Sequence, residues 1–142
     1  MSGSPGIGRT LLRGLLRHCP HCGGGHLFDR WFTLQERCPR CGMRFERQEG
    51  FMLGSMAINT IVTFLSVAAV VTVAMIATWP DVPMWPVMGL GAVAAIAVPA
   101  VFWPFAVTIW AAAELTMRPL EPDELADAAA HAAAHLTDRA SS

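Results

Sequence analysis

The chain has 142 residues, of which 54% are hydrophobic and only 15% are charged, and its mean hydropathy is +0.43. This composition is too apolar for an ordinary soluble domain and indicates a membrane protein. The charges are unevenly placed, because residues 1–50 hold eight arginines and four acidic residues, whereas residues 51–142 hold two arginines and seven acidic residues.

The first seventeen residues divide into a lead and a basic helix. Residues 1–8 are mainly small, polar or conformation-breaking, so we expect a disordered lead. Residues 9–17 place Arg9, Arg13 and Arg17 on one side of a helical wheel and four leucines on another, which predicts a short basic amphipathic helix. Two interpretations stay open. The leucines pack on the neighbouring module, or the helix lies on a lipid surface with its arginines on anionic headgroups.

Four cysteines define a candidate metal centre within residues 18–48. Cys19 and Cys22 form one Cys-Pro-x-Cys-Gly knuckle, and Cys38 and Cys41 form a second. Two such pairs separated by fifteen residues predict a zinc ribbon with four thiolates and one Zn(II) per chain. Tetrahedral sulfur also suits iron, so a rubredoxin-type site is the alternative. Disulfides are disfavoured because no secretory signal precedes the cysteines.

Aromatic residues lie between and after the two knuckles, where residues 27–34 and 43–46 are typical of short β-strands. A module this small needs metal to fold, and four aromatic residues are expected to form its miniature core: Phe28, Trp31, Phe32 and Phe45. Trp31, Phe32 and Arg40 are also candidate contacts for a protein partner. Nucleic acid is disfavoured, because the basic charge of the module is modest.

Two long uncharged runs follow, with thirty positions in residues 51–80 and thirty-two in residues 82–113. About twenty apolar residues cross a bilayer as a helix, so we predict one transmembrane helix at residues 51–79 and another at residues 87–113. Three prolines and two tryptophans lie in or beside residues 80–86, which predicts a tight external loop anchored at an interface.

Arginine placement predicts the orientation, since eight arginines precede the first span and the loop has none. The positive-inside rule then puts both termini in the cytoplasm. Asn59 and Thr63 belong to a polar stripe on the first span, which either packs on the second span or offers a contact to another membrane protein.

The tail begins with Pro122 and acidic residues and continues through alanines, so residues 121–136 predict an acidic, Ala-rich cytoplasmic helix, followed by a disordered end at 137–142. The roles of His131 and His135 on this helix stay open. The predicted fold is therefore a membrane α-helical hairpin with a small N-terminal cytoplasmic zinc-ribbon module and a C-terminal soluble helix.

Paired Cys-Pro-x-Cys-Gly knuckles, a Gly-His-Leu-Phe segment at residues 25–28 and two apolar spans resemble a bacterial membrane family, domain-of-unknown-function family nine-eight-three. The resemblance covers roughly residues 12–118 and implies a two-pass protein of the bacterial inner membrane. Genes for some members lie near those of cytochrome c oxidase subunits, which implies a link to respiratory oxidase but names no activity.

No nucleophile, base and orienting group stand at a recognisable spacing, and a saturated four-thiolate zinc site leaves no position for water, so we do not expect an enzyme. The sequence favours a docking, accessory or assembly factor for a membrane complex. A rubredoxin-like electron carrier and a membrane-tethered regulatory or nucleic-acid-linked ribbon are the alternatives.

Overall fold

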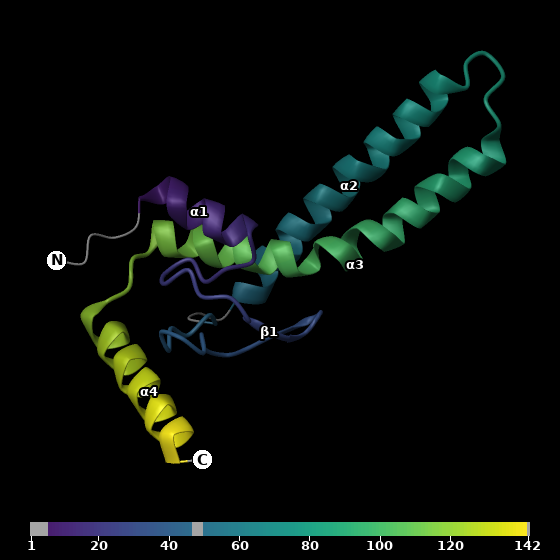
Figure 1. Ribbon diagram of the computed structural model, residues 1–142. Helices are drawn as coiled ribbons and strands as arrows, with labels where there is room; N and C mark the ends of the chain where they lie inside the picture. Colours follow the sequence, from purple (N-terminus) through teal and green to yellow (C-terminus); the bar gives the residue numbers. More distant parts are fainter. Residues whose placement is uncertain (1–5, 47–49, 142) are drawn as a thin grey trace.

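A computed structural model describes residues 6–46 and 50–141 of the chain. Two long helices form a hairpin, and the remaining elements gather at its open end, opposite the loop that joins the long helices (Figure 1). Both described ends of the chain lie on this side. The elements in chain order are α1 (Ile7–Leu15), β1 (Phe28–Arg30), β2 (Thr33–Leu34), α2 (Phe51–Ala77), α3 (Met84–Met117) and α4 (Pro122–Ser141).

The hairpin confirms the prediction of two long apolar helices. Over their most apolar windows α2 and α3 have mean hydropathies of 2.4 and 2.1, so both are long and apolar enough to cross a membrane. They approach closely at Gly91, where an added Cβ would lie 3.2 Å from Val71 Cγ2. A small residue such as Gly91 therefore lets α2 and α3 approach each other closely at this point.

Helix α3 is longer at both ends than the predicted residues 87–113. Because α2 also ends early, the loop covers residues 78–83 and not 80–86. Helix α3 begins directly after Pro83, because the first turn of a helix needs no internal N–H donors and tolerates Pro86. It continues through Glu114, since one charge does not stop a helix, and ends before Arg118 and Pro119. Helix α2 ends at Ala77, two residues before the predicted limit.

Two prolines, Pro99 and Pro104, lie inside α3, and the helix bends along its length (Figure 1). Pro104 has no N–H group, so the carbonyl of Ala100 loses its usual helical donor. Trp31 lies in the turn between β1 and β2, which forms the tip of the predicted zinc-ribbon module. Its indole Nε1 donates to the Ala100 oxygen at 2.9 Å. In return, Trp103 Nε1 donates to Phe32 O at 3.3 Å. The bend in α3 is therefore also the place where the ribbon attaches.

Helix α1 begins and ends two residues earlier than predicted. Residues 7 and 8, expected in the disordered lead, form its first turn, whereas residues 1–5 lie outside the described part. Arg17 has φ +59°, a left-handed conformation that ends the helix and turns the chain into the first knuckle. Gly14 packs against α3, where an added Cβ would lie 2.8 Å from Ala112 Cβ and 2.9 Å from Thr108 O.

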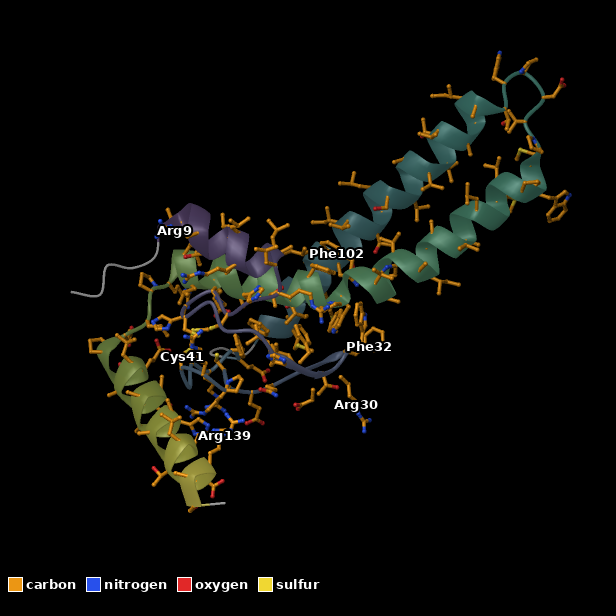
Figure 2. The ribbon with its side chains drawn as sticks, viewed as in Figure 1. Arg9, Arg30, Phe32, Cys41, Phe102 and Arg139 are labelled. Atoms are coloured by element: carbon orange, nitrogen blue, oxygen red, sulfur yellow. The ribbon has the colours of Figure 1, made fainter. Side chains whose placement is uncertain are left out.

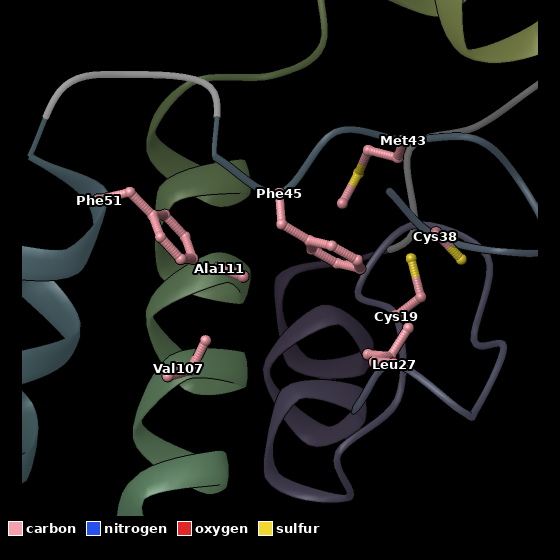
Figure 3. Close-up of a cluster of buried hydrophobic side chains, with 8 residues drawn as sticks. All are labelled: Cys19, Leu27, Cys38, Met43, Phe45, Phe51, Val107 and Ala111. Atoms are coloured by element: carbon pink, nitrogen blue, oxygen red, sulfur yellow. The ribbon is translucent and has the colours of Figure 1, made fainter. Parts of the chain in front are cut away.

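The buried core is shared between the ribbon and both long helices, and the metal module does not form it alone. Met43 and Phe45, just after the second knuckle, pack in one cluster with Phe51 of α2 and with Val107 and Ala111 of α3 (Figure 3). The expected miniature aromatic core is wrong for Trp31 and Phe32, which are 45% and 60% exposed. They lie at the hairpin turn, where neighbouring strands cannot cover them, while Phe28 is half-buried.

Helix α4 covers the second knuckle. Its Ala128 carbonyl lies so close to Gly42 that any side chain there would collide with it. Asp127 accepts a hydrogen bond and ion pair from Arg37 at 2.8 Å. The helix also runs beyond the predicted limit at 136. Residues 137–141, expected to be disordered, are helical: Thr137 Oγ1 donates to Ala133 O, and Arg139 lies in the last turn, where a positive charge is favourable.

Candidate metal centre

The two knuckles have matching backbone geometry. Gly23 N–H donates to Cys19 O at 2.8 Å, and Gly42 N–H donates to Cys38 O at 2.9 Å. Gly23 and Gly42 have φ values of +74° and +71°, which a side chain would disfavour. The glycine after each pair thus closes a tight turn that aims both sulfurs of a knuckle inward.

The four thiols form a compact cluster, which confirms that the paired knuckles come together. Cys19 Sγ lies 3.8 Å from Cys41 Sγ, Cys22 Sγ lies 3.7 Å from Cys38 Sγ, and all four sulfurs lie within 4.8 Å of one another. Metal–sulfur bonds of about 2.3 Å in a tetrahedron place sulfurs about 3.8 Å apart. Sulfurs in a disulfide are separated by about 2.05 Å. The cluster fits one tetrahedral metal ion.

Hydrogen bonds between the thiols shift their pKa values in opposite directions. The pKa of Cys22 falls from 9.0 to about 6 because the Cys19 thiol donates to its sulfur, while the same interaction raises the pKa of Cys19. Gly24 N–H also donates to Cys22 Sγ at 3.3 Å. Hydrogen bonds that stabilise thiolates are typical of structural metal sites, where outer-shell N–H groups share the negative charge.

The metal would be held by two buried sulfurs and two half-buried ones. Cys19 and Cys38 are buried, and Cys22 and Cys41 are partly exposed. Among the described residues, this group holds four cysteines and no histidine. Four sulfur ligands complete a tetrahedron, so a bound ion would have no free position for water or substrate. The same donor set suits zinc and iron.

The predicted partner contacts are distributed between two places. Trp31, Phe32 and Arg40 belong to the ribbon, and Phe32 lies at its tip near α3 (Figure 2). Trp31 is 45% exposed, but its indole N–H already donates to Ala100 O within the molecule. Arg40 is exposed, and its side chain covers Gly24, with Cδ 3.1 Å from an added Cβ.

Asn59 and Thr63 lie on α2, away from the ribbon residues. Both are half-buried, and Thr63 Oγ1 donates to Asn59 O at 2.7 Å. The Asn59 Oδ1 atom is buried and has no hydrogen-bond partner among the described residues. The polar stripe therefore lies on the partly covered side of α2, with one acceptor left to satisfy.

Arg13 of α1 and Arg17, just after this helix, have structural roles that the sequence interpretation missed. Arg13 Nη1 donates to His21 O at 3.0 Å, inside the first knuckle. The guanidinium carbon of Arg17 lies 5.2, 4.8 and 5.6 Å from the ring centres of Phe28, Trp31 and Phe105. Such cation–π contacts join α1, the ribbon and α3. The aromatic residues beside the knuckles were the available signal for this role.

The two histidines of α4 face the ribbon. His131 and His135 line a groove together with Glu36, Cys38 and Pro39. Asp127, one turn earlier, is paired with Arg37. Within the described residues these side chains do not form a group with ligand atoms close enough to share a metal.

Residues 28–115 match the family model described as "Protein of unknown function (DUF983)". The match includes Cys38, Cys41 and both long helices, while Cys19 and Cys22 precede it. Comparisons with curated proteins and with solved structures give no match. Because the matched segment covers more than half of the chain and contains the ribbon hairpin, the second knuckle and the helical hairpin, the protein belongs to the DUF983 family.

Proposed function

We propose that this protein is a two-pass protein of the bacterial inner membrane that holds a structural zinc ribbon against the cytoplasmic face. We further propose that it acts there without catalysis, as a docking, accessory or assembly factor for a membrane complex. The observation that carries the proposal is the attachment of a closed four-sulfur centre to an apolar helix. A saturated site favours a structural metal, and the attachment fixes the ribbon beside the membrane.

The attachment involves side chains and backbone on both partners. Trp31 donates to α3, Trp103 of α3 donates to the ribbon, and Val107 and Ala111 complete the ribbon core. A module held this way cannot diffuse away from the bilayer. Its effective concentration towards neighbouring membrane proteins is therefore high, and weak contacts can suffice for binding.

Two exposed ribbon side chains support docking. Phe32 is 60% exposed at the tip, and Arg40 is exposed beside the first knuckle. Aromatic and arginine side chains are enriched among the residues that dominate binding energy in protein interfaces. The half-buried polar pair Asn59 and Thr63 on α2 offers a second contact within the bilayer. The resemblance suggests a respiratory oxidase as the first candidate complex.

Metal analysis tests the first half of the proposal. Purified protein should contain one equivalent of zinc per chain and show no visible absorption. One equivalent of iron with a red colour would instead support a rubredoxin-like electron carrier, because Fe(III)–thiolate centres absorb visible light.

Thiol labelling tests the orientation. A cysteine placed by Asp81→Cys, in the loop, should react with an impermeant maleimide on intact cells. The four native cysteines provide the internal control, since they should react only after the membrane is opened and the metal removed. Protection of the new cysteine on intact cells would reverse the orientation.

Native membranes test the docking role. Photocrosslinking from position 32 or 40, followed by affinity purification, should recover a membrane partner, and a Phe32→Ser, Arg40→Ser variant should lose it. Deletion of the gene should lower the amount of an assembled complex. Unchanged complexes, with no partner captured at either position, would refute the docking role.

A further inference from the structure

Helix α1 presents an apolar face that no described element covers. Its exposed hydrophobic side chains are all aliphatic, with exposed fractions between 37% and 67%: Ile7, Leu11, Leu12, Leu15 and Leu16 at its C-terminal cap. Arg9 is also exposed and flanks this face, next to Leu16 on the helical wheel. Figure 2 shows side chains projecting from the side of α1 that faces away from the ribbon. A row of exposed leucines on one helix face needs an apolar partner.

The rotation of α1 is fixed by its opposite face. Thr10 and Gly14 are buried, and Gly14 approaches the α3 backbone so closely that the helix cannot turn. Arg13 and Arg17 point into the ribbon, where they contact His21 O and the aromatic rings. The leucines therefore do not pack on the metal module, which corrects one of the two interpretations of this helix. The two arginines are also not free to bind lipid headgroups.

The position of α1 matches the edge of a bilayer. Residues 84–103 of α3 and 58–77 of α2 each contain twenty residues, which span about 30 Å as helix, the thickness of a hydrocarbon core. Beyond them, Phe51 and Ser55 of α2 and residues 104–112 of α3 pack in the core with the ribbon and α1. Figure 1 shows α1 beside this last part of α3, where the bend has turned it away from the hairpin direction.

We infer that α1 is an in-plane membrane anchor whose aliphatic face lies in the acyl-chain boundary of the leaflet where the hairpin enters. This inference rests on the proposed membrane placement of the hairpin. The C-terminal part of α3, predicted as the last third of a transmembrane span, then runs along the membrane surface beneath α1. Apolar burial supplies most of the binding, because Arg13 and Arg17 are engaged inside the molecule and only Arg9 is exposed to meet an anionic headgroup.

A lipid surface fits better than a second copy of the chain. The neighbouring hairpin helices expose side chains of the same kind, including Val101 on α3 and Leu53 on α2, which are 58% and 71% exposed. The α1 face belongs to a helix of nine residues, about 14 Å long. One side of so short a helix offers much less area than the roughly 800 Å² per partner that stable protein interfaces bury.

Acyl-chain photolabelling tests this placement. The full-length, metal-loaded protein is reconstituted into phosphatidylcholine vesicles, with and without phosphatidylglycerol, that contain a lipid with a diazirine in its acyl chain. After irradiation, mass spectrometry should locate adducts on the hairpin helices and on α1, especially at Leu12 and Leu15, in both lipid mixtures. Leu136 on α4, which is 68% exposed, should remain unlabelled and serves as the control.

A variant separates the two proposals. Leu12→Glu with Leu15→Glu should abolish α1 labelling, while hairpin labelling and bound metal stay unchanged, and Leu136→Glu should change neither. A labelled hairpin with unlabelled α1, α1 labelling that requires phosphatidylglycerol, or crosslinks between the α1 helices of two copies would overturn the inference. An unlabelled hairpin would overturn the proposed membrane placement itself, and the inference with it.

Discussion

Trp31→Phe removes the indole donor that satisfies the Ala100 carbonyl at the bend of α3. The lost bond leaves a half-buried acceptor next to Pro104 without a donor, which costs about 1 kcal/mol. Phenylalanine also weakens the contact with Arg17, whose guanidinium carbon lies 4.8 Å from the indole ring, by up to about 0.5 kcal/mol. Together these losses total about 1–1.5 kcal/mol, so we expect the ribbon to open about 5- to 13-fold more often.

The assay is metal release to a chelator from the purified protein, under conditions where the release rate is proportional to the open population. Trp79→Phe is the matched control, because Trp79 is 77% exposed near the far loop. The control should release metal at the wild-type rate.

A double-mutant cycle isolates the hydrogen bond. Pro104→Ala supplies a backbone N–H four residues after Ala100, so this amide can satisfy the carbonyl that Trp31 otherwise serves. Trp31→Phe should then cost about 1 kcal/mol less than in the wild-type background. Equal costs in both backgrounds, or release no faster than in Trp79→Phe, would refute the reasoning.

Three further predictions concern the metal, the α1 contact and α4. Cys38→Ser should reduce bound metal well below one equivalent, measured by elemental analysis, because the tetrahedron loses a thiolate. Gly14→Ala should destabilise the protein by about 1–3 kcal/mol in detergent unfolding, whereas Gly8→Ala, with nothing within 4 Å, should not destabilise it. Arg37→Ala should cost at most about 1 kcal/mol, since its ion pair with the exposed Asp127 is solvent-screened.

The features that the sequence determined alone are those encoded in short spacings. The repeated Cys-Pro-x-Cys-Gly pattern brings Cys19 and Cys22 together, and likewise Cys38 and Cys41, because two residues and a left-handed glycine close each knuckle. The uncharged runs predict α2 and α3, since their length and apolar character need no tertiary partner to be recognised. The tail predicts α4 because Pro122 and acidic residues begin it and alanines, which strongly favour helix, follow.

The tertiary structure alone decided which face of each element meets which neighbour. Arg17 follows a basic helix, and the helical pattern cannot reveal that its partners are Phe28, Trp31 and Phe105, far apart in the chain. By hydropathy alone, residues 104–112 are predicted to belong to the same transmembrane span as the rest of α3. Their small and apolar side chains suit contact with lipid and with protein equally, so only the packing of α1 and the ribbon on this segment distinguishes the two.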